Sequence, residues 1–127
     1  MKIEERIPGF MKNHNFLRRF GYAWAGLKIC WASERSFRTH VVGAAFVLIV
    51  LAATHPAPVW WAILFLVSGA VIALEAINTA VEKLIDHVHP DQHAIIGIVK
   101  DTLAGAVLVM SATALLVFVA FLFSLLS

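Results

Sequence analysis

Two long stretches without a charged residue constrain the fold of this chain more than any other feature. No Lys, Arg, Asp or Glu occurs from residue 39 to 74, and none occurs from residue 102 to 127. A helix of about 20 apolar residues is long enough to cross a bilayer. The chain is 61% hydrophobic and 14% charged, whereas soluble domains are about half apolar and about a quarter charged. The sequence therefore predicts an all-α integral membrane protein.

Turn signals divide the apolar region into three transmembrane helices. His55-Pro56-Ala57-Pro58 predicts a tight uncharged turn, and Pro90 marks a second loop. The first apolar run is short for a bilayer, and residues 37–40 would supply the missing length. Trp60 and Trp61 are expected to form an aromatic belt at the start of the second span. We expect helices over about 36–55, 59–86 and 94–126, containing spans at about 41–54, 59–74 and 102–126.

A basic amphipathic helix is expected ahead of the spans, within a lead-in of residues 1–33. Between about residues 10 and 31, apolar side chains recur at helical spacing and Lys and Arg flank them. Such a helix lies in the membrane interface, with its cations on anionic head groups. The alternative is a solvated helix that packs on its own protein. The stripe consists of Phe16, Leu17, Phe20, Trp24, Leu27 and Trp31.

We expect residues 1–127 to form a single domain. Three local features lead to further structural expectations. Ser33 is expected to cap the first transmembrane helix. Gly97 and Gly105 flank Asp101 at four-residue spacing, which would allow another helix to approach closely there. The one cysteine, Cys30, excludes an intrachain disulfide.

The basic residues predict the orientation in the membrane. Eight of the ten Lys and Arg precede residue 39, and the other two are Lys83 and Lys100. By the positive-inside rule, the N-terminus and the 83–101 loop are cytoplasmic and the C-terminus lies outside. A net charge of +2 gives no reason to expect a nucleic-acid partner.

Four polar residues share one face of the second transmembrane helix and its extension. Glu75, Asn78, Glu82 and Asp86 are spaced at i, i+3, i+7 and i+11. Glu75 is costly to place in a membrane and calls for a reason. A desolvated carboxylate is a stronger base than a solvated one, which suits a general base acting on a lipid hydroxyl at that depth. The alternative is that Glu75 only bonds a neighbouring helix.

The remaining acids lie on the same predicted side of the membrane as Lys100. Acids at such spacing hold Mg²⁺, which usually takes further oxygen ligands from a phosphate. A lysine and nearby arginines offset the charge of a polyphosphate. Each group has a plain alternative: a solvated helix end for Glu82 and Asp86, snorkelling for the arginines, and loop positions for the histidines. The acids are Glu34, Glu82, Asp86, Asp91 and Asp101, and the histidines are His87, His89 and His93.

Four sequence segments resemble the small bacterial diacylglycerol kinase and undecaprenol kinase family. They are FGYAWAGLK, ERSFRTH, ALEAINTAVEKLID and KDTLAGAV, within a resemblance that covers about residues 15–110. The resemblance implies a homotrimer in the bacterial inner membrane, with active sites shared between chains at the cytosolic face. It also implies transfer of the γ-phosphate of Mg-ATP to the hydroxyl of a membrane lipid.

The same motifs imply roles for individual residues. Glu75 matches the catalytic base, with Asn78 beside it, and Glu34 and Glu82 match the carboxylates that hold the ATP-bound metal. The residues that match the nucleotide site, besides Glu34 and Glu82, are Tyr22, Asp91, His93, Lys100 and Asp101. Trp24 and Arg38 are expected with Glu75 on the lipid side. Asn15 stands near a position where some members have a basic residue, so either Arg18 or Arg19 replaces that contact or the contact is absent.

The lipid substrate is the least constrained expectation. ERSFRTH, LEAINTAVEKLID and HPDQH favour undecaprenol, with diacylglycerol as the second candidate. A non-enzymatic membrane subunit or a small channel, with Glu75 as an ion site, is the alternative from another class. A channel would need polar residues along a span, whereas the third span offers only Ser111 and Thr113 between its ends. An inactive homologue would not need the acids, Asn78 and Lys100 together.

Overall fold

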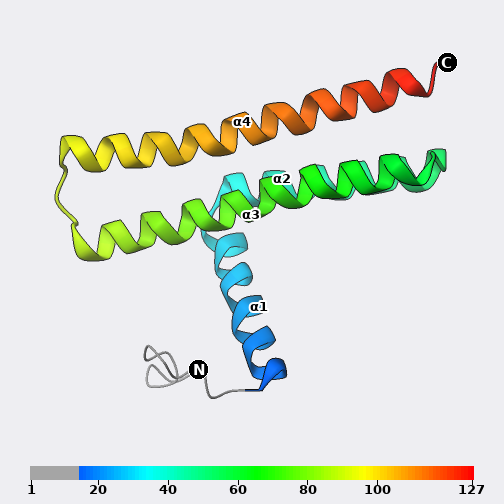
Figure 1. Cartoon of the computed structure of the whole chain (residues 1–127). Coiled ribbons are helices and arrows are strands. Elements are labelled where there is room, and N and C mark those ends of the chain that lie inside the picture. Colours follow the sequence, from blue (N-terminus) through cyan, green and yellow to red (C-terminus); the bar gives the residue numbers. More distant parts are fainter. Residues whose placement is uncertain (1–14) are drawn as a thin grey trace. The chain divides into compact units, whose positions relative to one another are not determined.

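The computed structural model describes residues 15–127, and these residues form helices and no strand. Figure 1 shows the four elements in chain order. They are α1 (Phe16–Ser33), α2 (Arg35–Thr54), α3 (Pro58–Val88) and α4 (Ala94–Ser124). The chain divides after Ser33 into two compact units, which are described separately below. The all-α fold predicted from the sequence is confirmed.

The first unit contains α1, whose apolar stripe stays exposed. Asn15 caps this helix, because its Oδ1 accepts a hydrogen bond of 3.1 Å from the backbone N–H of Arg18. Phe16, Leu17 and Trp24 are exposed, which suits a helix that lies with its apolar face in a lipid interface. The predicted start at residue 10 falls outside the described residues.

The boundary between the units corrects the expected cap. The Ser33 hydroxyl donates back to the carbonyl of Ile29 at 2.7 Å, so it satisfies α1 and not α2. Glu34 takes the N-cap position of α2 with extended backbone, and its side chain makes no capping hydrogen bond. The prediction that Ser33 caps α2 is therefore wrong by one residue.

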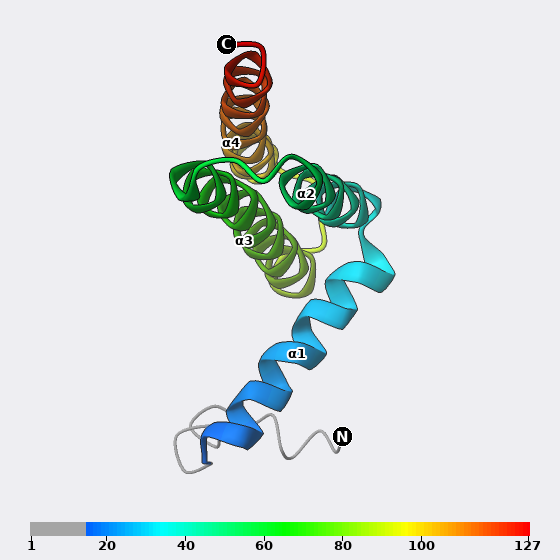
Figure 2. The same cartoon turned by 90° about the vertical axis from the view of Figure 1, so that its right-hand side faces the viewer.

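In the second unit, α2, α3 and α4 are each long and apolar enough to cross a membrane. The 20 residues of α2 extend about 30 Å at 1.5 Å per residue, the thickness of a hydrocarbon core. The protein is therefore an integral membrane protein with three spans, and residues 37–40 do lengthen the first one. In Figures 1 and 2, α3 and α4 run antiparallel, α2 lies beside α3, and the three helices form the corners of a triangle.

The core of this unit lies at the end where α2 turns into α3. Leu51, Leu64, Val67 and Phe121 are its buried members. His55 ends α2 in the left-handed conformation (φ 47°), and Pro58 begins α3. Trp60 and Trp61 are half-buried and pack against this core, and the Trp60 ring lies 5.5 Å from that of Phe121. These tryptophans therefore contribute to helix packing as well as standing at the start of α3.

The glycines of α4 do not provide a close helix contact within the chain. A Cβ added at Gly97 or Gly105 would meet no heavy atom within 4 Å. The expected small-residue packing face beside Asp101 is therefore not used by the described part of the chain.

Candidate functional site at one end of the spans

Glu75 is a buried carboxylate on a membrane-spanning helix. It is 2% exposed, and the residues that directly precede it on α3 are apolar. The Ser36 hydroxyl, in the first turn of α2, donates a short hydrogen bond to Glu75 Oε1. A buried charge is costly unless it is paired and hydrogen-bonded. The hydrogen bond from Ser36 therefore helps to stabilise Glu75 in its buried position.

A histidine from α2 meets the same carboxylate oxygen. His40 Nδ1 lies 2.8 Å from Glu75 Oε1. The contact joins a ring nitrogen to a carboxylate oxygen, and Nδ1 has no hydrogen-bond partner among the described residues. On the other side of the ring, His40 Nε2 lies 3.1 Å from Ser111 Oγ on α4. Glu75 is thereby connected to both other spans.

Exposure increases along the polar face of α3. Glu75 is buried, Asn78 and Glu82 are half-buried, and Asp86 is exposed. Asn78 Oδ1 is fully enclosed and has no hydrogen-bond partner among the described residues. An enclosed acceptor without a partner calls for an explanation, and a ligand that brings a hydroxyl is one.

The contact with Ser36 fixes the depth of Glu75. Because Ser36 lies in the first turn of a helix that is just long enough to span, Glu75 lies near one end of the hydrocarbon core. Arg35 and Arg38 belong to the same end of α2. Beyond Glu75, α3 continues to Val88, a length of about 20 Å. The polar end of α3 and the start of α4 therefore extend past the span formed by α2.

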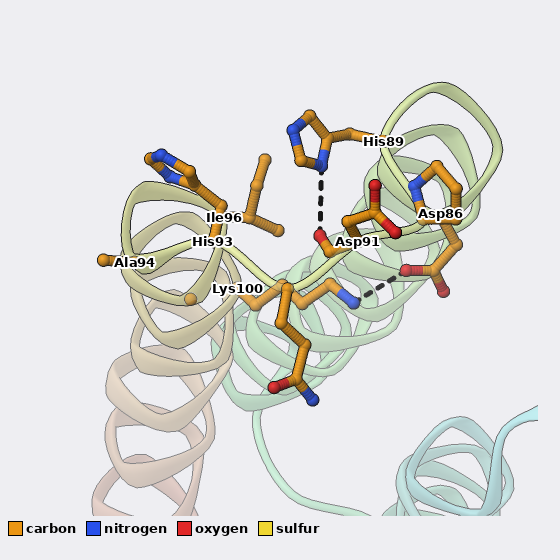
Figure 3. A pocket seen from close by; sticks show the side chains of 10 residues that line it. Asp86, His89, Asp91, His93, Ala94, Ile96 and Lys100 are labelled. Atoms are coloured by element: carbon orange, nitrogen blue, oxygen red, sulfur yellow. Dashed lines mark hydrogen bonds and ion pairs between the residues drawn. The ribbon is translucent and has the colours of Figure 1, made fainter.

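A polar pocket lies where α3 turns into α4. It has a volume of about 470 Å³ and is lined by residues 86, 89–94, 96, 97 and 100. Figure 3 shows Lys100 reaching from α4 across to Asp86 on α3, where its Nζ lies 2.7 Å from Asp86 Oδ1. His93 caps α4, because its Nδ1 accepts a hydrogen bond of 3.1 Å from the Ile95 N–H. His89 Nδ1 contacts the Asp91 carbonyl at 3.0 Å. The pocket thus contains the ammonium group of Lys100 beside the carboxylates of Asp86 and Asp91. It lies at the polar end of α3 and α4.

The predicted acids do not gather into a metal cluster within one chain. Among residues 15–127, no group of three or more His, Cys, Asp and Glu is placed to hold a metal ion. The side chains of Glu34 and Glu82 make no hydrogen bond or ion pair with another described residue. Their oxygens are therefore available to a cation, and Mg²⁺ needs only one or two carboxylates when phosphates supply its other ligands. The donor set fits Mg²⁺ held together with a polyphosphate.

Other predicted residues are found at several places. Asp101 is exposed at the start of α4, next in sequence to Lys100. Arg38 lines an open hollow with Arg35, Thr39 and Val42. Tyr22 and Trp24 lie on α1, in the first unit.

Three residues of the site were missed as site members by the sequence reasoning. Ser36 and His40 stand at four-residue spacing on α2, so a helical reading places them on one face. Ser111 is one of two polar residues noted in the third span. Ser111 could have been noticed as a polar side chain inside an apolar run, and Ser36 and His40 as polar side chains at the edge of one. A polar side chain in such a position calls for a partner. Nothing in the local pattern says that Glu75 is that partner.

Fold and site together define a class of protein: a three-span membrane protein with a buried carboxylate near one membrane face and a charged pocket beyond it. A family model described as prokaryotic diacylglycerol kinase matches residues 21–122. The chain belongs to the prokaryotic diacylglycerol kinase family, a family of lipid kinases.

Individual relatives show the same likeness. A diacylglycerol kinase of Synechocystis sp. is 38% identical over 104 residues, which are 81% of this chain and 59% of that protein. The undecaprenol kinase of Bacillus subtilis is 33% identical over 98 residues, 77% of this chain and 80% of that protein. A diacylglycerol kinase of Escherichia coli is 26% identical over 93 residues, 73% of this chain and 76% of that protein. The chain thus spans under two thirds of the Synechocystis relative and most of the other two.

Proposed function

We propose that this protein phosphorylates the hydroxyl of a membrane lipid with the γ-phosphate of ATP. The observation that carries the proposal is the position of Glu75: a buried carboxylate near one end of the spans, on the helix face that leads to the charged pocket. Family membership supports the reaction class. The two ends of this face would serve a lipid substrate and a water-soluble nucleotide, respectively.

Glu75 acts as the general base in this proposal. Its Oε1 is already engaged by Ser36, while Oε2 accepts no hydrogen bond from a described residue. The lipid hydroxyl gives its proton to Oε2, its oxygen attacks the γ-phosphorus, and ADP leaves. Asn78, one helical turn from Glu75 on the same face of α3, orients this hydroxyl by donating a hydrogen bond from its side-chain amide N–H to the hydroxyl oxygen. Trp24 and Arg38 contribute to the lipid side.

The nucleotide binds toward the α3–α4 turn. Lys100 and Asp101 contact it, with Asp91, His93 and Tyr22, and the ammonium group of Lys100 offsets phosphate charge. Glu82 lies about 10 Å along α3 from Glu75, a span that a triphosphate covers. Mg²⁺, held by Glu34 and Glu82 together with phosphate oxygens, would neutralise charge as the phosphoryl group moves.

The assembly and orientation complete the proposal. We place the N-terminus and the 83–101 loop in the cytoplasm, where ATP is available, and the chain in the bacterial inner membrane. A homotrimer with shared sites would bring carboxylates of neighbouring chains together, which suits a chain whose own acids form no cluster of three among residues 15–127.

The substrate proposal is undecaprenol, with diacylglycerol as the alternative, and relatives carry both names. The test is purified full-length protein with γ-labelled ATP and Mg²⁺ against undecaprenol, diacylglycerol and ceramide in separate mixed micelles. We expect labelled phosphate in the lipid fraction with undecaprenol at the highest kcat/KM. A higher value for diacylglycerol reverses the substrate order. No labelled lipid in any micelle refutes the kinase proposal in favour of a non-enzymatic membrane subunit.

A further inference from the structure

His40 contacts the proposed base, Glu75, but does not itself bind the lipid, the nucleotide or the metal in the proposed reaction. Its Nδ1 lies 2.8 Å from Glu75 Oε1, and its Nε2 lies 3.1 Å from Ser111 Oγ. One imidazole ring therefore stands between a carboxylate of α3 and a hydroxyl of α4. It reaches both from α2, one helical turn from Ser36.

The contact with Ser111 is linked to the tautomer of the ring, because the hydroxyl can donate to Nε2 or accept from it. A neutral imidazole has one N–H donor and one acceptor nitrogen, and the hydrogen bond at one nitrogen sets the state of the other. When the Ser111 hydroxyl donates to Nε2, the ring proton is on Nδ1. Nδ1 is fully enclosed and has no hydrogen-bond partner among the described residues, and the closest carboxylate oxygen is Glu75 Oε1. The ring is thus set to present a donor to the carboxylate.

The two oxygens of Glu75 are in different situations. Oε1 is met by both Ser36 and His40, whereas Oε2 accepts no hydrogen bond from a described residue. The fully enclosed unpaired side-chain atoms of residues 15–127 are His40 Nδ1 and Asn78 Oδ1, and Glu75 Oε2 is not among them. One oxygen is therefore held by α2, and the other is left for a substrate.

A cavity beside His40 has no charged side chain in its wall. On the side away from Glu75, His40 lines a cavity of about 410 Å³ between α2, α3 and α4. Thr39, Ser68 and Ser111 are its other hydrogen-bonding side chains, and His40 is the one ionisable residue in its wall. An interaction between His40 and Glu75 in such a setting is screened little by water or salt.

We propose that His40 is a positioning residue for Glu75 and that Ser111 holds the ring in the tautomer with the proton on Nδ1. The pair keeps Oε1 occupied and the carboxylate in one rotamer, so that Oε2 is free to take the proton of the lipid hydroxyl. His40 itself neither gains nor loses a proton in this step. This inference rests on the proposed role of Glu75 as the general base.

Two isosteric substitutions separate the two ring nitrogens. The amide nitrogen of His40→Asn lies close to the position of Nδ1, and that of His40→Gln lies close to the position of Nε2. Because the contact that keeps Oε1 occupied and the carboxylate in one rotamer is lost, we expect His40→Ala and His40→Gln to lower kcat about tenfold or more. The KM for Mg-ATP is expected to stay within about twofold of the wild-type value, because the nucleotide end is untouched. His40→Asn is expected to retain most of kcat.

The same kinetic series contains the results that overturn the proposal. If His40→Ala keeps half or more of the wild-type kcat, the His40 ring does not position Glu75. A His40→Gln enzyme that is more active than His40→Asn assigns the contact to the wrong nitrogen. A KM for Mg-ATP that rises as much as kcat falls indicates a general structural defect instead of a positioning role.

A spectroscopic measurement tests the contacts without using activity. In full-length protein with ¹⁵N-labelled histidine, the His40 ring signals are identified among the six histidines by their loss in His40→Asn. We expect Glu75→Gln to shift the Nδ1 signal and Ser111→Ala to shift the Nε2 signal. If neither signal moves, the inference fails even when the wild-type protein is an active kinase. If both move and the wild-type protein phosphorylates no lipid, the contacts stand, and the proposed function and the positioning role in catalysis fail.

Discussion

Replacing Lys100 with methionine is expected to weaken the use of ATP without unfolding the protein. Lys100 Nζ lies 2.7 Å from Asp86 Oδ1, and the two side chains are 37% and 64% exposed. Exposed ion pairs contribute little to stability, so the midpoint of thermal unfolding should stay close to the wild-type value. A charged hydrogen bond to a phosphate contributes about 1.5–3 kcal/mol, so its loss should raise the KM for Mg-ATP roughly 10- to 150-fold.

The assay is the initial rate of lipid phosphorylation over a range of Mg-ATP concentrations, with thermal unfolding followed by circular dichroism. Lys83→Met is the matched control, because Lys83 is an exposed lysine on α3 that does not line the pocket. It makes the same change in net charge. If Lys100→Met leaves the KM for Mg-ATP within about twofold of wild type, Lys100 is not a phosphate contact. If Lys83→Met raises the KM equally, the effect is one of general charge.

Two further predictions concern the metal and the packing. Glu34→Ala and Glu82→Ala should each raise the Mg²⁺ concentration needed for half-maximal rate about tenfold, because each removes a carboxylate ligand. The measurement is a magnesium titration of the initial rate. If neither variant differs from wild type, both residues are excluded from the metal site. Leu51→Ala should lower the free energy of unfolding by about 2–5 kcal/mol, because Leu51 is fully buried in the core near the α2–α3 turn. Its kcat should stay near the wild-type value, since Glu75 lies toward the other end of the spans, and a variant as stable as wild type in a denaturant titration would contradict the core assignment.

Much of the fold followed from the sequence, because hydrophobicity and turn signals are local properties. The uncharged stretches and the turn signals placed the three helices expected over about 36–55, 59–86 and 94–126 within one or two residues of α2, α3 and α4. The cap of α2 was misplaced because Ser33 satisfies the preceding helix instead. Local preference favours serine over glutamate as an N-cap, so at this boundary it selects the wrong residue of the pair.

The site was predictable only as far as single helices allow. The apolar run before Glu75 showed that a carboxylate there is costly to place in a membrane. The helical repeat showed that Glu75 and Asn78 share one face of the helix. The partners of Glu75 come from α2, and the partner of Lys100 is Asp86 on α3. Such pairs depend on how helices are rotated and aligned against each other, which the order of polar and apolar residues within one helix does not determine.

The most direct test of the central claim is the turnover of Glu75→Gln. Glutamine keeps the side-chain size and an oxygen that accepts a hydrogen bond from Ser36, but it is not a base. The measurement is kcat with γ-labelled ATP and undecaprenol or diacylglycerol in mixed micelles, with binding of Mg-ATP to the same preparation as the control for folding. We expect kcat to fall about 10²- to 10⁴-fold while Mg-ATP binding is retained. A variant that binds Mg-ATP and keeps more than about a tenth of the wild-type kcat would contradict the assignment of Glu75 as the base.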